Sequence, residues 1–240
     1  MNLEGKRAIV TGAGSGIGAA IAERLAADGA RVVVSDVDEA AARKLADKLR
    51  GRMCAADVSS EDQVARLVDF AVRELGGLDV MVNNAGVGEQ PGPIDEKPGA
   101  DWHRILGINL SGAFYGVKHA ARVMKKAGRG GVIVNMASVL GLVGFAAAPA
   151  YTAAKHGLLG LTKAAALDLA PARIRVVGVS PAFIRTPLIS GLEETVLPLH
   201  PIGRLGEAAE VASMVAYLVS DEAAFLTGAT YLVDGGYTAP

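Results

Sequence analysis

Short apolar runs alternate with longer amphipathic segments along the whole chain. The apolar runs are rich in valine and isoleucine and nearly continuous, which is typical of parallel strands covered on both faces. The longer segments are rich in alanine and leucine and predict the helices that connect such strands. The predicted strands span residues 7–10, 31–35, 52–55, 78–82, 131–136, 174–179 and 230–233. The predicted helices span residues 17–28, 39–49, 60–75, 101–126, 151–169 and 207–219.

This order of elements predicts an α/β fold with a doubly wound parallel sheet of about seven strands, flanked by helices. Gly29 and the pair Gly76-Gly77 follow predicted helices and supply the expected stop signals. The chain has 240 residues, and no linker-like stretch or internal repeat divides it. We therefore expect a single domain over residues 1–240.

Charge and cysteine content narrow the function by exclusion. The 24 Lys and Arg residues and 25 Asp and Glu residues give a net charge of -1. The chain therefore lacks the excess of positive charge that is typical of proteins that bind nucleic acid or an anionic membrane. The lone Cys54 cannot form an internal disulfide, and we expect it to be buried in a strand. The N-terminal apolar run is too short for a signal peptide or a membrane span, which predicts a cytoplasmic protein.

Polar and glycine residues gather where the predicted strands end. In an open parallel sheet, ligands bind beyond the carboxyl ends of the strands, where connections diverge to opposite faces. The residues at these ends are Thr11-Gly12, Asp36, Asp57, Asn83-Asn84-Ala85-Gly86, Ser138 and Ser180-Pro181. The sequence therefore predicts a site assembled from separated strand ends.

The first predicted strand runs into a glycine-rich turn, Thr11-Gly12-Ala13-Gly14-Ser15-Gly16-Ile17-Gly18. Gly12 permits a tight turn, Gly16 lets the backbone approach a pyrophosphate, and Gly18 allows close packing of helix on strand. The N-terminus of the helix then faces the anion. An isolated match would favour a plain turn, but the strand before and the helix after supply the context of a dinucleotide site.

Asp36 follows the second predicted strand, where a carboxylate can accept hydrogen bonds from both hydroxyls of an adenosine ribose. Its charge would repel a 2′-phosphate, and the neighbours Ala13, Ser35 and Val37 are uncharged. NAD(H) is therefore preferred to NADP(H). The alternative role of Asp36 is to cap the next helix, which Asp38 can do instead.

Side chains after the third and fourth predicted strands each have two possible roles. Asp57 could accept a hydrogen bond from an adenine amino group beside the backbone of Val58, or it could cap the helix near Ser60. Both alternatives stay open. Asn83 and Asn84 carry amides that can tie loops together, so we expect at least one of them to be structural.

Tyr151 and Lys155 stand four residues apart, which places them on one face of a predicted helix. A lysine charge within a few ångströms would lower the pKa of the tyrosine from about 10 towards the working pH. Tyr151 can then act as a general acid or base. This spacing also occurs by chance on helix surfaces, and it is the upstream Ser138 that favours the functional interpretation.

Two further polar residues join this pair. Ser138 closes the fifth predicted strand, where its hydroxyl could orient a substrate carbonyl towards Tyr151 or cap a helix. Asn109 lies inside a long predicted helix, where asparagine is unfavourable. A local kink that exposes its amide to a water near Lys155 would explain that position, and a surface-facing side chain is the alternative.

Together these residues resemble the short-chain dehydrogenase/reductase family over essentially the whole chain. The motifs in family order are the Thr-Gly-x-x-x-Gly-x-Gly turn at 11–18, Asn83-Asn84-Ala85-Gly86, Asn109, Ser138, Tyr151-x-x-x-Lys155 and Pro181 to Thr186. The resemblance implies an NAD-binding Rossmann fold and usually a homotetramer, with a homodimer as the alternative. It implies that Tyr151 is the acid/base and that Lys155 holds the nicotinamide ribose. It also implies that Ser138 positions the substrate and that Asn109 anchors a proton-relay water.

The cofactor contacts implied by the resemblance run along the whole crevice. Asp36 corresponds to the NAD selector of the family, and Asp57 with Val58 corresponds to its adenine contact. Ile184 and Thr186 correspond to its carboxamide contacts. The full set is Gly12, Ser15, Gly16, Ile17, Gly18, Asp36, Asp57, Val58, Asn84, Ala85, Gly86, Tyr151, Lys155, Pro181, Ile184 and Thr186.

The residues expected to set substrate identity are mostly apolar. Besides Ser138 and Tyr151 they are Leu140, Leu142, Val143, Phe145, Ala182 and the loop 186–192 with Leu188. They favour a small hydrophobic alcohol or ketone (alicyclic, aryl-alkyl or steroid-like), although several could instead form a subunit interface. Ala182 departs from the glycine usual after Pro181 in the family and would narrow the space beside the nicotinamide. Arg185 is the nearest cation, and we expect it to face solvent.

The resulting hypothesis is an NAD(H)-dependent oxidoreductase that interconverts a secondary alcohol and a ketone. A 3-oxoacyl-thioester (acyl-carrier-protein) reductase of the same family would share every catalytic residue. A non-catalytic nucleotide-binding module would be expected to lack part of the set Ser138, Tyr151 and Lys155. The longer epimerases and dehydratases need a further C-terminal domain, for which 240 residues leave no room. The four histidines show no spacing typical of metal ligands, so no metal is expected.

Overall fold

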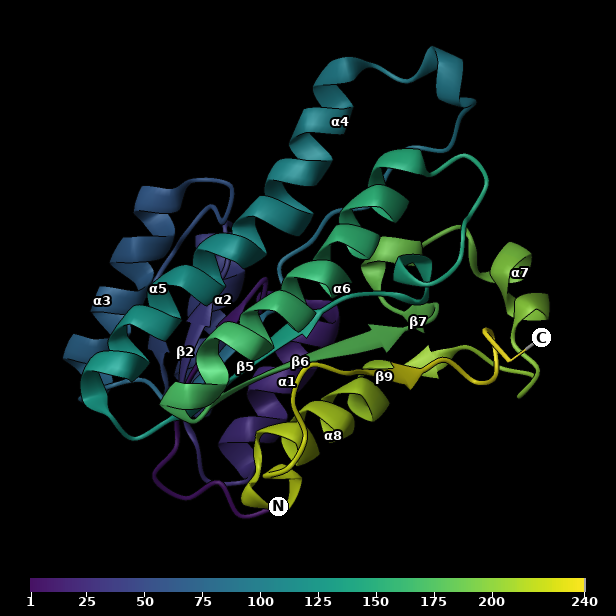
Figure 1. The fold of residues 1–240 in the computed structure, drawn as a ribbon. Coiled ribbons are helices and arrows are strands. Elements are labelled where there is room, and N and C mark those ends of the chain that lie inside the picture. The colour runs from purple at the N-terminus through teal and green to yellow at the C-terminus, as the bar shows by residue number, and fades with distance from the viewer. Residues whose placement is uncertain (240) are drawn as a thin grey trace.

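A parallel sheet of seven strands lies between two layers of helices in the computed structural model, which describes residues 1–239 (Figure 1). The strand order is β3-β2-β1-β4-β5-β6-β9, so the winding reverses between β1 and β4 and creates the crevice typical of such sheets. The strands are β1 (Arg7–Thr11), β2 (Arg31–Ser35), β3 (Arg52–Met53), β4 (Val80–Asn83), β5 (Gly131–Met136), β6 (Ile174–Pro181) and β9 (Thr230–Val233). A separate two-stranded pair is formed by β7 (Ile184–Arg185) and β8 (Gly206–Glu207).

The helices divide between the two faces of the sheet. One face is covered by α1 (Gly16–Ala27), α2 (Glu39–Leu49) and α8 (Ala208–Val219). The other face is covered by α3 (Glu61–Leu75), α5 (Gly112–Ala127) and α6 (Pro149–Leu169). The remaining helices are α4 (Gly99–Leu106), which extends beyond the sheet, and the short α7 (Glu193–Val196) after β7 (Figure 1).

Successive residues of each central strand bury against opposite layers. Ala8 and Val10 of β1 belong to the core under α1 and α8, whereas Ile9 belongs to the core under α3 and α5. All three side chains are fully buried. This double burial is the reason that the strands appear in the sequence as continuous apolar runs. The predicted α/β fold class is confirmed.

The edge strand β3 is shorter than the sequence predicted. It pairs only with β2 and only at two residues, Arg52 and Met53. Cys54 therefore lies beyond the strand and is partly exposed, and the prediction that it is a buried strand residue is wrong. The other strands of the seven-stranded sheet lie where the sequence placed them to within two residues at each end, whereas the short pair β7 and β8 was not predicted.

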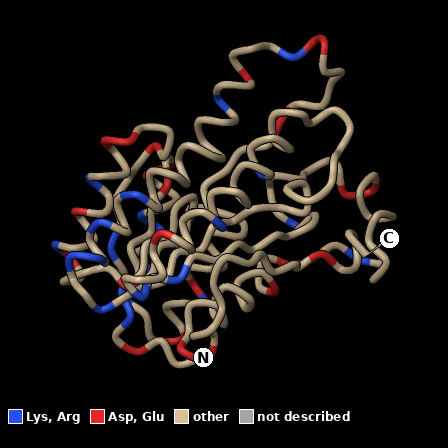
Figure 2. Tube along the Cα trace, viewed as in Figure 1, with Lys and Arg blue, Asp and Glu red and all other residues tan. Residues whose placement is uncertain are grey.

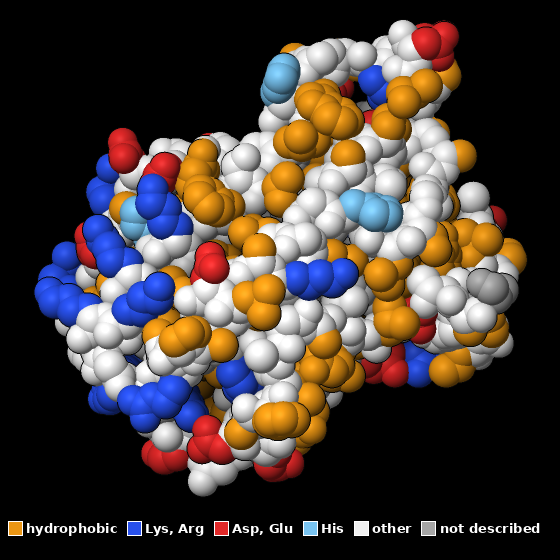
Figure 3. Space-filling model, viewed as in Figure 1, with side chains coloured by type: hydrophobic (Ala, Val, Ile, Leu, Met, Phe, Trp, Pro, Cys, Tyr) orange, Lys and Arg blue, Asp and Glu red, His pale blue; other side chains and the backbone are white. Residues whose placement is uncertain are grey.

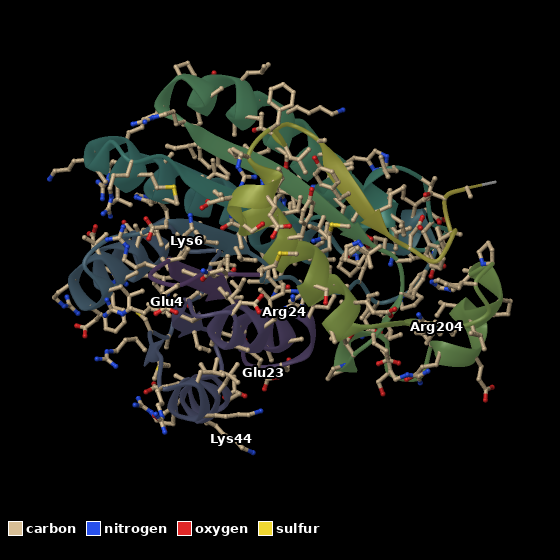
Figure 4. All side chains as sticks on the ribbon, turned by 90° about the horizontal axis from the view of Figure 1, so that it is seen from below. Glu4, Lys6, Glu23, Arg24, Lys44 and Arg204 are labelled. Carbon is tan, nitrogen blue, oxygen red and sulfur yellow. The ribbon has the colours of Figure 1, made fainter. Side chains whose placement is uncertain are left out.

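Basic side chains gather at the end of the molecule where the strands begin, on the left in Figures 2 and 3. A cavity of about 440 Å³ opens there, and its charged lining consists of Lys6, Asp79, Arg129, Arg173, Arg175 and Asp221. Lys6 and Arg204, both labelled in Figure 4, lie towards opposite ends of the molecule. Among residues 1–239, no helix is long and apolar enough to cross a membrane, and no three His, Cys, Asp or Glu side chains cluster as metal ligands would.

Close packing of α1 on β1 depends on Gly18. A Cβ atom at this position would overlap the carbonyl oxygen of Gly12 and the side-chain nitrogen of Asn84. We expect Gly18→Ala to lower the free energy of unfolding by about 1–3 kcal/mol through overpacking, measured by urea denaturation. Gly99→Ala is the control, because no atom lies within 4 Å of a Cβ there. Equal losses in the two variants would contradict the role of Gly18.

Candidate active site

The glycine loop forms a tight turn between β1 and α1. Gly12 and Gly16 have φ angles of 61° and 55°, in the left-handed region that favours glycine. A Cβ on Gly12 would lie 2.6 Å from the Cα atom of Ala85. Ser15 precedes α1 and makes no side-chain cap hydrogen bond. The backbone N–H groups that open α1 are therefore available to an anion such as a pyrophosphate.

Asp36 lies at the end of β2 with its carboxylate against this loop. Its Oδ2 atom accepts a hydrogen bond from the N–H of Gly14 at 2.8 Å, and a Cβ on Gly14 would approach that oxygen to 2.9 Å. The helix cap is supplied instead by Asp38, whose Oδ1 atom accepts from the N–H of Ala41 at 3.0 Å. Of the two roles considered for Asp36, capping of α2 is therefore excluded.

Asp57 makes a local turn rather than a helix cap. Its Oδ1 atom accepts from the backbone N–H and the hydroxyl of Ser59, at 2.9 and 2.7 Å. Ser60, not Asp57, precedes the first residue of α3. Val58 is buried, and a Cβ on Gly112 of α5 would come within 2.8 Å of it. Val58 thus packs the segment after β3 against α5.

Both asparagines after β4 have structural contacts. Asn84 donates through Nδ2 to the carbonyl oxygen of Thr11 at 2.9 Å, and the Thr11 hydroxyl accepts from the N–H groups of Asn84 and Ala85, each at 3.1 Å. Asn83 donates to Oδ1 of Asn135 at 2.9 Å. The prediction that at least one of them is structural is confirmed, and the end of β4 is tied to the glycine loop.

A π-helical turn over Gly107–Ser111 lies between α4 and α5, inside the long helix that the sequence predicted over residues 101–126. Asn109 lies in this turn and is buried. Its Oδ1 atom accepts from the N–H of Val87 at 2.8 Å, and its Nδ2 atom donates to the Val87 carbonyl at 2.9 Å. The expected local kink is present, and a surface-facing asparagine is excluded. The amide binds the loop after β4, next to Gly86 and within the neighbourhood of Lys155.

Tyr151 and Lys155 occupy the first turns of α6. The helix begins at Pro149, whose missing N–H is not needed at that position. The Nζ atom of Lys155 lies 5.4 Å from the centre of the Tyr151 ring. Lys155 is 4% exposed and donates from Nζ to the carbonyl oxygen of Met136 at 2.7 Å. This bond fixes the helix against the last residue of β5.

Ser138 follows β5 and faces the same space. Its Oγ atom accepts from the N–H of Leu140 at 3.1 Å, which caps the short helical turn Val139–Gly141. Its side chain lies beside the Tyr151 phenol, where it acts to lower the pKa of that phenol. The capping role and the placement beside Tyr151, which the sequence posed as alternatives, therefore occur together.

Burial dominates the protonation of this pair. It raises the pKa of Tyr151, and the neighbouring Ser138 opposes that shift only in part. Burial also lowers the pKa of Lys155 to about 8. The sequence led us to expect that Lys155 would lower the pKa of Tyr151 towards the working pH. That expectation is not met, because removal of the phenol from water raises its pKa more than the neighbouring Ser138 lowers it.

The loop after β6 closes the crevice from the other side. Ala182 is partly buried, and Ile184 is buried where β7 pairs with β8. Thr186 donates to the Ile184 carbonyl at 3.1 Å, and a Cβ on Gly16 would touch Thr186 at 3.4 Å. The structure thus brings residues 182–186 up to the glycine loop. Arg185 is exposed and paired with a surface carboxylate, as expected.

Apolar residues surround this end of the crevice, where hydrophobic side chains cover α7 and β7 in Figure 3. Leu140 is buried, whereas Leu142, Val143 and Leu188 are exposed. An aromatic cluster that the sequence did not reveal joins the predicted Phe145 to Phe183, His200 and Tyr237, with ring centres 5.7–6.0 Å apart. These residues are far apart in the chain, so no local pattern could have linked them. A cavity of about 260 Å³ lies beside them.

Known proteins are similar to this chain in sequence and in fold. A family profile described as enoyl-(acyl carrier protein) reductase matches residues 12–238. Cyclohexanol dehydrogenase of Acinetobacter sp. (strain SE19) is 45% identical over 240 residues, which cover 98% of this chain and 95% of the relative. The chain belongs to the short-chain dehydrogenase/reductase family.

Two further known proteins are similar to this short-chain dehydrogenase/reductase. It is 48% identical to cis-4-hydroxycyclohexanecarboxylate dehydrogenase of Sinomonas cyclohexanicum, over 97% of this chain and 96% of the relative. It also superimposes on the structure of 3-ketoacyl-(acyl-carrier-protein) reductase from Brucella melitensis complexed with NADH, with a TM-score of 0.96, 36% identity and coverage of 99% and 100% of the two chains. The protein is an oxidoreductase that acts on CH–OH groups with a nicotinamide cofactor.

Buried Lys155 makes stability depend on pH. Because its pKa in the folded protein is about 8 rather than 10.5, the unfolded chain holds a proton between these values that the folded protein has lost. Stability therefore rises with pH across this window. We expect the free energy of unfolding of the parent protein, relative to Lys155→Met, to rise by up to about 1.4 kcal/mol per pH unit there. Urea denaturation without cofactor, at a series of pH values, measures this difference in the free energy of unfolding. Lys163→Met, at an exposed lysine, is the control. A difference between the parent protein and Lys155→Met that stays constant or falls with pH would contradict the burial argument.

Proposed function

We propose that the protein is an NAD(H)-dependent dehydrogenase that interconverts a small hydrophobic secondary alcohol and its ketone. The observation that carries this proposal is the convergence of Ser138, Tyr151 and Lys155 next to the loop after β4, which packs against the glycine loop. The Ser138 hydroxyl lies close enough to the Tyr151 phenol to act on its pKa, so an alcohol oxygen that binds beside them can contact both groups. We further propose that residues 1–240 form one NAD-binding domain.

The proposed proton chemistry uses this pair directly. In the oxidation of an alcohol, the phenolate oxygen of Tyr151 accepts the hydroxyl proton, and in the reverse reaction the phenol returns it. Ser138 is held by the Leu140 N–H, so its own hydrogen is free to bond to the substrate oxygen and orient it. A bound nicotinamide supplies the hydride acceptor or donor for the carbinol carbon.

The residues of the crevice are suited to holding that cofactor. The start of α1 offers backbone N–H groups to the pyrophosphate, and we assign the adenine contacts to Asp57 and Val58. Lys155, with three ammonium hydrogens of which one bonds to Met136, can donate to the nicotinamide ribose. Residues 184 and 186 lie next to the glycine loop, which supports their assignment to the carboxamide.

The preference for NAD over NADP is proposed from Asp36. Its carboxylate is held beside the glycine loop by the Gly14 N–H. It can accept hydrogen bonds from both hydroxyls of an adenosine ribose, whereas a 2′-phosphate would meet a like charge.

Uncharged alicyclic alcohols are the proposed substrates. The relatives named for cyclohexanol and for a hydroxycyclohexanecarboxylate support a cyclic substrate. Two cations beside the crevice are already paired, Lys97 with Glu89 at 3.1 Å and Arg185 with Glu207 at 3.2 Å. A substrate carboxylate would have to compete with these acids, which favours the uncharged alcohol.

The likeness to a 3-ketoacyl-(acyl-carrier-protein) reductase supports a second candidate, a 3-oxoacyl-thioester reductase. A carrier-bound thioester brings an anionic phosphate on its arm. Glu193 and Glu194 begin α7, and Lys and Arg residues are most numerous towards the opposite end of the molecule (Figure 2). This distribution of charge favours the free alcohol over the carrier-bound substrate.

The proposed homotetramer is supported by exposed large apolar side chains on several helices and near the C-terminus. They include Trp102, Phe114, Leu167, Phe225 and Leu232. A homodimer remains the alternative assembly. The cytoplasmic location expected from the sequence stays a prediction.

Tyr151→Phe tests the reaction. Cyclohexanol, 4-hydroxycyclohexanecarboxylate and a 3-oxoacyl thioester are assayed by absorbance of the reduced nicotinamide. We expect the parent protein to prefer cyclohexanol and Tyr151→Phe to lower kcat roughly 100- to 10,000-fold, because the proton acceptor is lost. The NADH dissociation constant should stay within about twofold, since the ring remains. Tyr115→Phe is the control, and full activity of Tyr151→Phe would refute the assignment.

Asp36→Ala tests the cofactor preference. We expect the ratio of kcat/KM for NAD to that for NADP to fall roughly tenfold or more, because a charged hydrogen-bond acceptor is lost and a repulsion is removed. Asp38→Ala is the matched control, since it removes the cap of α2 and leaves the crevice carboxylate in place. An unchanged ratio in Asp36→Ala, or an equal change in both variants, would contradict the role of Asp36.

A further inference from the structure

A buried glutamate from a distant loop binds the backbone of the proposed catalytic tyrosine. The Oε2 atom of Glu89 accepts a hydrogen bond from the N–H of Tyr151 at 2.9 Å. Glu89 lies in the loop after β4, and its side chain is only 3% exposed. No contact of this carboxylate is needed for the reaction described above, so its burial calls for a separate explanation.

The start of α6 has no cap of its own. Ala148 occupies the position before the helix and offers no side-chain acceptor. Pro149 has no N–H, so the first N–H groups that need acceptors belong to Ala150 and Tyr151. A carboxylate at this end of a helix is also favoured by the helix dipole. Glu89 thus supplies from outside the cap that the local sequence lacks.

The second oxygen of Glu89 extends the contact to another loop. Its Oε1 atom lies 3.1 Å from Nζ of Lys97, whose side chain is 15% exposed. Lys97 also donates to the carbonyl oxygens of Ala147, at 2.9 Å, and Gln90. Ala147 has a φ of 67°, a left-handed conformation that is unfavourable for a residue with a Cβ. The Lys97 bond therefore holds the chain in the turn that leads into α6.

These contacts join the two loops that border the start of α6. The loop after β4 reaches over this helix end in Figure 1. A buried ion pair is costly to desolvate, and it persists where hydrogen bonds satisfy its remaining polar atoms. Here both ends of the pair are bonded to backbone atoms of one turn, residues 147–151. The pair therefore fixes the position of the backbone from which the Tyr151 side chain extends.

We propose that Glu89 and Lys97 form a positioning clamp that sets the Tyr151 phenol against Ser138. This proposal rests on the proposed function, because the clamp has a role in proton transfer only if Tyr151 is the group that exchanges the proton. Small errors in the placement of a reacting group can cost orders of magnitude in rate. The clamp should therefore act mainly on kcat, because the proposed pyrophosphate and adenosine contacts at the glycine loop and Asp36 do not involve Glu89 or Lys97.

Three variants separate the parts of the clamp. Glu89→Ala removes both contacts, Glu89→Gln keeps an acceptor oxygen for the Tyr151 N–H, and Lys97→Met removes the bond to Ala147. We expect kcat to fall roughly tenfold or more in Glu89→Ala, and less in Glu89→Gln, with the NADH dissociation constant within about twofold of the parent value. Hydrogen exchange at the Tyr151 amide should accelerate in Glu89→Ala. Glu23→Ala, which breaks an exposed ion pair with Lys48, is the matched control.

Several outcomes would overturn the clamp. One is a kcat of Glu89→Ala within twofold of the parent value, and another is a parallel loss of kcat and NADH affinity, which would indicate general damage. If Glu89→Ala does not fold, the other two variants decide the question. An unchanged kcat in both Glu89→Gln and Lys97→Met would refute the clamp, and a lowered kcat in these variants would support it. A parent protein inactive on every alcohol would defeat the proposed function alone, because exchange at the Tyr151 amide still tests the clamp without turnover.

Discussion

The hydrogen bond from Lys155 to the carbonyl oxygen of Met136 is the contact on which the rest of the site depends. It fastens α6 to the last residue of β5, so that Tyr151 comes to lie beside Ser138, two residues beyond the strand. The same Nζ atom lies near Gly86, where a Cβ would approach it to 3.8 Å. A buried ammonium group is unfavourable, and the lowered pKa of about 8 reflects that cost. The ammonium group of Lys155 therefore lies at the centre of the site, and its displacement would break the contact between α6 and β5.

Burial at this point also decides which form of the tyrosine is favoured. The raised pKa of Tyr151 keeps the neutral phenol stable at neutral pH, and the phenol is the form that donates a proton to a ketone. Oxidation of an alcohol needs the phenolate instead, and the neighbouring Ser138 shifts the balance in that direction by acting to lower the Tyr151 pKa. Placement and protonation therefore have a common origin. The position of α6 in the core determines where the phenol lies and how readily it ionises.

Much of this arrangement follows from the sequence, because parallel strands buried on both faces leave a continuous apolar pattern and their ends share one edge. The capping of α2 by Asp38 and the kink at Asn109 were predictable from the ordinary preferences of these residues. The pKa of Tyr151 was not, because spacing along a helix gives the distance to a charge and not the loss of water. Glu89 and Lys97 belong to no motif, and their contacts with α6 depend on how two loops fold.

The central claim is that Tyr151 exchanges the proton of the substrate hydroxyl, and the pH dependence of a single turnover tests it most directly. Stopped-flow absorbance of the reduced nicotinamide follows oxidation of cyclohexanol and reduction of cyclohexanone under enzyme excess. The account predicts that the oxidation rate rises with pH while the reduction rate falls, about one shared pKa, because one direction needs the phenolate and the other the phenol. Rates that are independent of pH, or that change in the same sense in both directions, would contradict it.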